Sequence, residues 1–346
     1  MNKLNQLQAL RGIAAMLVCC FHAKDYINFQ FPIGDILFGN GTIGVQIFFI
    51  LSGFIMVYTT KTYDYNNKFK NFRTFMLKRI IRVVPLYFAL TIVWLVLVNR
   101  SILFINNENL YPILKALLFI PSEQEPPLYV GWTLNYEMFF YLIFGVSLMF
   151  GKIRYAMIYG IILSLVFIIP QFSTVDFTLS ASPEYFSNPY FNMATNDLLL
   201  YFLSGVFIGN IYDKIKISNA IVWLMFIISI IAFLLHYFNL LEFLQTKLLI
   251  CSMLIFSVIL MDVKLNLKSS SFLSYLGDIS YSIYLIHPIV ILIIRGVVKK
   301  TGFEEYLYTP LVFVLIIIVT LIASSVTYKY IEIKFTRLIK NSIGIH

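Results

Sequence analysis

The amino-acid sequence predicts an all-α integral membrane protein with about ten transmembrane helices and with both termini on the cytoplasmic side. Three observations lead to this prediction: the apolar composition, the number of long apolar runs, and the positions of the basic residues. Of the 346 residues, 60% are hydrophobic and only 12% are charged, and the mean hydropathy is +0.83. A soluble domain has about 25% charged residues. A chain this long and this apolar could not cover a water-exposed surface with polar groups, so a soluble fold is excluded.

Ten apolar runs, each bounded by charged or turn-forming residues, are long enough to cross a bilayer. The segment 113–120 (ILKALLFI) is too short to span, and we expect it to be an interfacial or re-entrant piece. No repeat relates the two halves and no low-complexity linker divides the chain, so residues 1–346 are expected to form one membrane domain. In chain order, the predicted spans are 9–26, 43–60, 80–98, 131–150, 153–171, 195–211, 219–238, 243–262, 279–298 and 308–331.

The basic residues orient these spans. When the N-terminus is placed inside, most of the 26 Lys and Arg residues fall in inner segments, above all in the stretch 61–82 and in the short loops 152–154, 214–216 and 264–268. Cytoplasmic loops of membrane proteins carry such an excess of basic residues. The net charge of +9 therefore indicates topology, and no nucleic-acid partner is expected. The three cysteines lie in apolar runs without metal-ligand spacing, so no metal is expected either.

A few ionisable residues fall within the predicted spans, where they normally face the bundle interior and mark a functional site. Arg11 and His22 are eleven positions apart in the first span, which corresponds to about 16 Å and to nearly the same helix face. By the rise per residue, His22 and Glu137 of the fourth span share a layer in the outer half of the membrane. A histidine oriented or made more basic by a carboxylate can act as general base on a hydroxyl. The alternative is a histidine satisfied by a backbone carbonyl, with Glu137 paired elsewhere.

Two further polar side chains lie near this depth. Gln46 is early in the second span, and His287 is near the centre of the ninth. His287 either belongs to the same site as His22 or, because it precedes Pro288, fills the gap that a proline leaves in a helix.

The second group of candidate residues is basic and lies at the start of the third span. Arg79 and Arg82 follow Lys78, and their spacing of three places them on one helix face, pointing into the inner interface beside Arg11. Such a cluster can hold phosphates through forked, charge-assisted hydrogen bonds. The alternative is a role in topology and in binding anionic lipid. The two groups together suggest that a phosphate-bearing donor docks from the cytoplasm and reacts deeper in the bundle; a coenzyme A thioester has a suitable shape.

Six motifs, in order, resemble those of the membrane-bound acyltransferase-3 family. The first contains Arg11, ten further residues and then His22, and the motifs extend from residue 7 to about residue 332, nearly the whole chain. In chain order they are LQALRGIAAMLVCCFHA (7–23), GVQIFFILSGFIM (44–56), FMLKRIIRVVPLY (75–87), GWTLNYEMFFYL (131–142), FLSGVFIG (202–209) and LGDISYSIYLIHP (276–288).

This resemblance implies transfer of an acyl group, most often acetyl, from cytoplasmic acyl-coenzyme A to a hydroxyl of a cell-envelope polysaccharide or its lipid-linked precursor. It implies a multi-pass protein of the bacterial cytoplasmic (inner) membrane, with acetyl-coenzyme A as co-substrate. The expected partners are membrane lipid and the glycan acceptor. Because no extracellular domain follows residue 346, a separate periplasmic or extracellular transferase is a further possible partner.

The resemblance also assigns roles to residues. His22 and Arg11 match the catalytic pair, and we add Glu137 to them as the carboxylate near His22. Lys78, Arg79 and Arg82 fall in the donor-side basic motif. Gln46 stands where many relatives carry an acid, so a second carboxylate beside His22 is not implied. The residues expected to line or shape the substrate cavity are Gln46, Ser52, Trp132, Tyr284 and His287.

Two other classes of protein remain open. A polysaccharide exporter or proton-coupled transporter could use His22 and Glu137 as a proton relay. Many transporter folds show paired repeats with interrupted helices, a symmetry that this sequence lacks. A scaffold subunit of an envelope assembly complex would tolerate substitution of His22 and Arg11.

Overall fold

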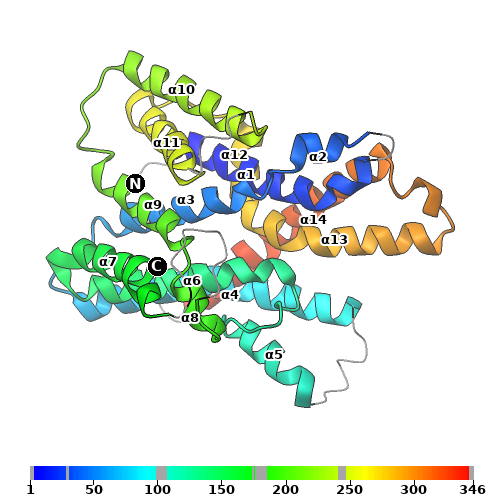
Figure 1. The fold of residues 1–346 in the computed structure, drawn as a ribbon, viewed down its shortest axis with the longest axis horizontal. Coiled ribbons are helices and arrows are strands. Elements are labelled where there is room, and N and C mark those ends of the chain that lie inside the picture. Colours follow the sequence, from blue (N-terminus) through cyan, green and yellow to red (C-terminus); the bar gives the residue numbers. More distant parts are fainter. Residues whose placement is uncertain are drawn as a thin grey trace. The chain divides into compact units, whose positions relative to one another are not determined.

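The computed structural model describes residues 4–28, 31–98, 107–173, 175, 185–240 and 247–342. Within these residues the regular secondary structure is helical and contains no strand, which confirms the predicted all-α class (Figure 1). The α-helices are α1 (Asn5–Ala23), α2 (Ile33–Phe38), α3 (Ile43–Thr60), α4 (Lys68–Val98), α5 (Asn107–Leu117), α6 (Trp132–Leu148), α7 (Arg154–Leu163), α8 (Pro189–Ala194), α9 (Leu199–Ile211), α10 (Asn219–Tyr237), α11 (Lys247–Leu260), α12 (Ser271–Asp278), α13 (Ser280–Lys300), α14 (Pro310–Thr327) and α15 (Thr336–Ser342).

Nine helical stretches in the described part of the chain have the length and hydropathy needed to cross a membrane. The fourth predicted span, 131–150, has no counterpart among these nine and forms α6, whose 17 residues lie at the lower end of the range of about 17–25 for a spanning helix. Residues 243–246, at the start of the predicted span 243–262, lie outside the described residues. The chain is a multi-pass membrane protein.

Two predicted boundaries are wrong. The third span was expected from residue 80, whereas α4 already begins at Lys68 and continues through Pro85. The Lys and Arg residues of this stretch are good helix formers, so the helix continues into the basic segment. The last span was expected to end at residue 331, but helical structure continues through a π-helical stretch, Tyr328–Phe335, into α15. The short segment 113–120 falls largely in α5, an 11-residue helix.

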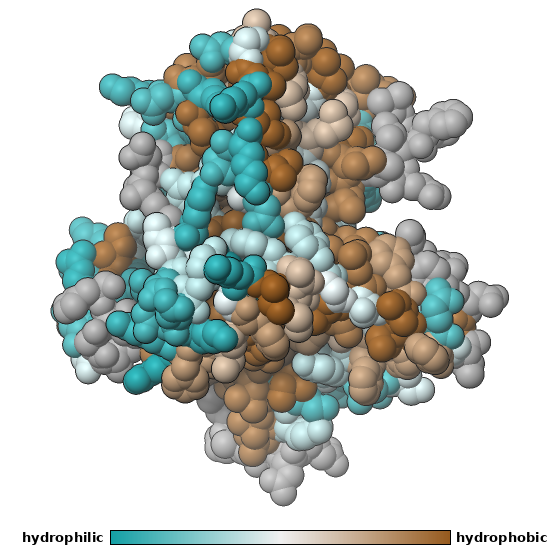
Figure 2. All heavy atoms as spheres, turned by 90° about the vertical axis from the view of Figure 1, so that its left-hand side faces the viewer, coloured by the Kyte–Doolittle hydropathy of each residue, from teal (hydrophilic) through white to brown (hydrophobic). Residues whose placement is uncertain are grey.

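Large apolar side chains lie on the surface in helical stripes. Along α10 the exposed ones recur every three or four residues, which is one face of a helix; they are Ile221, Leu224, Ile227, Ile228, Ile231 and Leu234. Figure 2 shows hydrophobic residues over large areas of the face that it presents. An apolar surface of this extent is stable against lipid and not against water.

The chain divides into two compact units. Unit 1 comprises Met1–Leu51 and Phe207–Tyr328, and unit 2 comprises Ser52–Val206 and Lys329–His346. Helices α3 and α9 contribute one end to each unit. Whether the two units act as a single domain stays a prediction.

In unit 1, α1 packs against α11, α12, α13 and α14, and most extensively against α12. The approach of α1 to α12 is close because glycines stand at the crossing: a Cβ added to Gly12 would lie 2.6 Å from Leu276 Cβ, and one added to Gly277 would lie 2.6 Å from the carbonyl carbon of Gln8. The start of α1 is also held by Asp262, whose two carboxylate oxygens accept hydrogen bonds from the main-chain N–H groups of Gln6 and Leu7, each at 2.9 Å. The π-helical stretch Met261–Leu265 after α11 and the start of α1 therefore lie at the same end of unit 1, as the predicted topology requires.

In unit 2, α4 packs against α6 through stacked and edge-on aromatic rings. Phe75 of α4 stacks on Phe144 of α6 with ring centroids 5.2 Å apart, and Phe140 stacks on Phe202 of α9 at 4.4 Å. At one end of these helices, Arg154 Nη1 donates to Thr60 O at 3.4 Å, and its guanidinium lies 5.0 Å from the centre of the Tyr65 ring. The loops 61–67 and 149–153, which lead to the basic residues Lys68 and Arg154, thus lie together, at what we call the basic end of unit 2.

Candidate functional site

The structure distributes the predicted site residues over the two units. Unit 1 holds Arg11, His22, Gln46, Tyr284 and His287. Unit 2 holds Ser52, Lys78, Arg79, Arg82, Trp132 and Glu137. Since His22 and Glu137 belong to different units, their pairing stays a prediction.

The two predicted histidines of unit 1 lie next to each other. His22, in the last turn of α1, stacks on His287 of α13 with ring centroids 5.2 Å apart and an angle of 27° between the ring planes. His22 is partly exposed, whereas His287 is completely buried.

The ring of His287 is oriented by the backbone of its own helix. Its Nδ1 lies 3.1 Å from the carbonyl oxygen of Ile283, four residues earlier, so Nδ1 carries the hydrogen and donates it. The missing N–H of Pro288 frees the carbonyl oxygen of Tyr284, four residues before the proline, whereas the Ile283 carbonyl lies one residue earlier. Nε2 of His287 is buried and has no hydrogen-bond partner among the described residues. Tyr284, whose ring is edge-on to His287 at 6.1 Å, packs from one turn earlier in α13.

Arg11 and Gln46, the remaining predicted residues of unit 1, make hydrogen bonds to residues three or four positions earlier in the chain. Arg11 Nη1 donates to Gln8 Oε1 at 3.0 Å, and α1 is continuous from Arg11 to His22, so their predicted separation of about 16 Å on one face holds. The Gln46 side-chain nitrogen donates to the carbonyl oxygens of Thr42 at 2.8 Å and Ile43 at 3.3 Å. Gln46 thereby satisfies carbonyl groups at the start of α3.

In unit 2, Glu137 is the acceptor of a polar network between two helices, α3 and α6. Ser52 of α3 donates its hydroxyl to Glu137 Oε1 at 3.0 Å, and Tyr141, one turn further along α6, donates its hydroxyl to the same oxygen. Charge-assisted hydrogen bonds of this kind are about twice as strong as neutral ones. Two predicted residues, Ser52 and Glu137, are therefore in direct contact, and Tyr141 is a third member that the sequence reasoning missed.

Arg79 extends this network on α4. It is 7% exposed, its guanidinium carbon lies 5.5 Å and 5.8 Å from the ring centres of Phe75 and Tyr141, and its Nη2 donates to Thr59 Oγ1 at 3.4 Å. Its Nε is buried without a hydrogen-bond partner among the described residues. A buried cation with one unused N–H group is suited to hold an anionic oxygen.

The other two basic residues differ from Arg79 in exposure. Arg82 is exposed and Lys78 is partly exposed, although Arg79 and Arg82 are close enough to interact electrostatically. Only Arg79 therefore points into the helix bundle of unit 2, a distinction that spacing on the helix did not predict.

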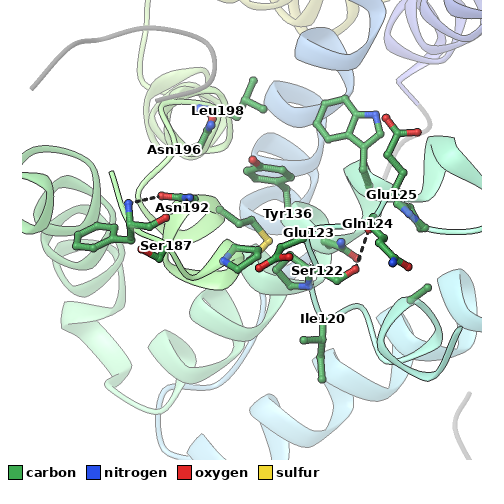
Figure 3. A pocket seen from close by; sticks show the side chains of 18 residues that line it. Ile120, Ser122, Glu123, Gln124, Glu125, Tyr136, Ser187, Asn192, Asn196 and Leu198 are labelled. Atoms are coloured by element: carbon green, nitrogen blue, oxygen red, sulfur yellow. Dashed lines mark hydrogen bonds between the residues drawn. The ribbon is translucent and has the colours of Figure 1, made fainter. Parts of the chain in front are cut away.

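Trp132 lines a cavity of unit 2 of about 720 Å³ (Figure 3). Its ring is edge-on to Tyr136 at 5.8 Å, in the first turn of α6. The other walls come from segment 120–126 and from residues 186–198 around α8. Within these segments the sequence reasoning singles out only Asp197, as an ionisable residue within the sixth span, and Asp197 is not among the lining residues. The only signal in the sequence was the density of amide side chains in NPYFNMATND (188–197).

Comparison with known proteins assigns the family. The acyltransferase domain model of the acyltransferase-3 family matches residues 4–329, nearly the whole chain and both units. The chain belongs to this acyltransferase family, as the six motifs predicted.

Two curated relatives are similar to parts of the chain. One is the exopolysaccharide production protein ExoZ of Rhizobium meliloti (strain 1021), 29% identical over 300 residues, which cover 84% of this chain and 86% of the relative. The other is the putative peptidoglycan O-acetyltransferase YrhL of Bacillus subtilis (strain 168), 31% identical over 159 residues, which cover 42% of this chain and 24% of the relative. No solved structure matches the chain.

Proposed function

We propose that the chain transfers an acyl group, most often acetyl, from acyl-coenzyme A on the cytoplasmic side to a hydroxyl of a cell-envelope polysaccharide or its lipid-linked precursor. The membership in the acyltransferase family supports this proposal. The names of the two relatives, one for exopolysaccharide production and one for peptidoglycan O-acetylation, support a glycan acceptor. Both relatives come from bacteria, which supports a place in the bacterial cytoplasmic membrane.

The observation that carries the proposal is the histidine pair of unit 1. The His22 ring is partly exposed, and it stacks on a buried ring that the Ile283 carbonyl holds in one orientation. A base held in this way is preorganised for proton transfer. Arg11, on the same helix face, supplies a positive charge toward the start of α1.

In the proposed reaction, His22 accepts the proton of the sugar hydroxyl while the hydroxyl oxygen bonds to the thioester carbonyl carbon. The carbon–sulfur bond then breaks, and the protonated imidazole returns its proton to the leaving thiolate. General-base catalysis of this kind contributes about 10²–10⁴-fold to the rate. A covalent acyl-histidine is a variant of the same scheme. Glu137 orients the acceptor or the base through the carboxylate that also binds Ser52 and Tyr141.

We further propose that the phosphates of coenzyme A bind at the basic residues of α4. Arg82 and Lys78 are accessible to a large donor. The unused Nε of the buried Arg79 fits a phosphate or carbonyl oxygen that enters the bundle. The basic end of unit 2, by the charge rule, faces the cytoplasm, where acyl-coenzyme A is made.

The test uses membranes that contain the full chain and radiolabelled acetyl-coenzyme A. The proposal predicts release of free coenzyme A thiol together with a labelled glycan, and loss of both for His22→Ala at an equal amount of protein in the membrane. A transporter or a scaffold subunit would give neither signal with the wild-type chain. Normal labelling by His22→Ala would remove His22 from the proposed role.

A further inference from the structure

The cavity of unit 2 lies at the opposite end of α6 from the basic end. Trp132, Asn135 and Tyr136 line it from the first turn of α6, whereas the last turn of α6, at Leu148, leads to the loop 149–153 at the basic end. Its volume of about 720 Å³ falls within the range of roughly 300–1,000 Å³ for small-molecule sites. By the charge rule this end faces away from the cytoplasm.

The lining of the cavity combines aromatic rings with carboxamide groups. Trp132 and Tyr136 present an edge-on pair of rings, and Trp132 is 40% exposed. Gln124, Asn135 and Asn196 contribute amides, each of which can both donate and accept hydrogen bonds. A pyranose ring needs this combination, because its C–H face packs on an aromatic ring while its hydroxyl groups both donate and accept.

Hydrogen bonds hold the wall of the cavity in place. Asn192 accepts from Phe186 N at 2.7 Å and donates to Phe186 O at 2.5 Å, which closes the segment before α8 onto the helix. Oδ1 of Asn196 accepts a hydrogen bond from the main-chain N–H of Leu198 at 2.9 Å. This bond fixes the orientation of the carboxamide group and therefore the direction of its two N–H bonds. A preformed wall lowers the entropic cost of binding a flexible ligand.

The charges around the cavity have one sign. Glu123 and Glu125 line it, and Asp197 lies close enough to act electrostatically on Tyr136. No lysine or arginine is among the described residues of the lining. An anionic ligand would meet like charges there without a compensating cation, so the cavity discriminates against uronic acids and phosphates.

We propose that this cavity binds the acceptor, as a glycan segment that carries no negative charge. The proposal rests on the proposed function, and it adds the acceptor site and its charge preference. Tyr136, which lines the cavity, and Glu137, which belongs to the polar network described above, are consecutive in α6.

The experiment measures binding of short oligosaccharides to the purified full chain in lipid nanodiscs, without any acyl donor. The uncharged probes are cellotriose and chitotriose, the anionic probe is trigalacturonate, and saturation-transfer NMR reports contact. At least one uncharged probe is expected to bind saturably, and trigalacturonate about tenfold more weakly. Trp132→Ala is expected to weaken binding about tenfold, while Trp132→Phe, which keeps an aromatic face, retains most of it.

Matched controls lie outside the cavity. Trp223 of α10 is 43% exposed and is edge-on to Phe226 at 6.3 Å, so Trp223→Ala removes a comparable ring and is expected to leave binding unchanged. The double substitution Glu123→Gln and Glu125→Gln is expected to strengthen binding of trigalacturonate, whereas the same changes at the exposed Glu304 and Glu305 are not.

Failure of this proposal differs from failure of the proposed function. If neither uncharged probe binds, if trigalacturonate binds as well as they do, or if Trp132→Ala binds like the wild type, the cavity is not the acceptor site, whether or not acyl transfer occurs. If the probes bind as expected but no acyl group is transferred from acetyl-coenzyme A, the cavity is a glycan-binding site and the proposed transferase function is wrong.

Discussion

The close crossing of α1 and α12 yields a quantitative prediction about the helix that carries Arg11 and His22. In Gly277→Ala the new Cβ would lie 2.6 Å from the carbonyl carbon of Gln8, and closer still to its oxygen, whereas ordinary van der Waals contact begins at 3.4 Å. Both atoms belong to the backbone of α1, so no side chain can rotate away. The two helices must separate by about 1 Å, and overpacking of this kind costs about 1–3 kcal/mol.

The assay is thermal unfolding of the full chain in nanodiscs, followed by tryptophan fluorescence. A loss of about 3 kcal/mol corresponds to a fall of roughly 4 °C in Tm for a chain of this size. Gly296→Ala is the matched control, because Gly296 also lies within a helix of unit 1 and an added Cβ there meets nothing within 4 Å. Alanine in that helix is expected to raise stability by up to about 1 kcal/mol. If Gly277→Ala melts at the temperature of Gly296→Ala, the steric reasoning is wrong.

Three further substitutions have defined outcomes. Tyr141→Phe removes a hydroxyl that donates to the Glu137 carboxylate and is expected to lower the free energy of unfolding by about 1.5–3 kcal/mol, measured by the same melting assay. Asp262→Ala removes the acceptor of two main-chain N–H groups at the start of α1 and is expected to cost about 1–2 kcal/mol, again read from Tm. Arg82→Ala is expected to raise the KM for acetyl-coenzyme A several-fold with a smaller effect on kcat, whereas Arg73→Ala, an exposed residue earlier in α4, leaves this KM unchanged.

Each of these predictions has an outcome that contradicts it. The stability losses need to exceed those of Tyr308→Phe and Glu304→Ala, which alter exposed side chains of the same types. Equal losses in the exposed variants would mean that the two networks contribute nothing specific. An unchanged donor KM in Arg82→Ala would leave this residue with a topological role only.

The sequence was sufficient for features that depend on composition and on local periodicity. The all-α membrane class follows from the apolar runs, and the family follows from motifs that the chain keeps in order. The placement of Arg11 and His22 on one face of α1 required only the helical repeat. The start of α4 was missed because basic residues end a hydropathy peak without ending a helix.

The contacts between helices could not be predicted in this way. That His287 lies on His22, and that Tyr141 and Ser52 share one oxygen of Glu137, depends on how α1 meets α13 and how α3 meets α6. The cavity combines segments 120–126 and 186–198, which are far apart in sequence. Neither segment carries a motif, because amide and aromatic side chains indicate a binding site only when the fold brings them together.

The most direct test of the central claim is acyl transfer across a sealed proteoliposome that holds the chain in one orientation. Radiolabelled acetyl-coenzyme A is supplied only on the side of the basic loops, and the glycan acceptor only on the other side. The wild-type chain is expected to label the glycan, and His22→Ala, inserted to the same level, is expected to leave it unlabelled. Labelling by His22→Ala at the wild-type rate, or wild-type labelling only when donor and acceptor share one side, would contradict the account.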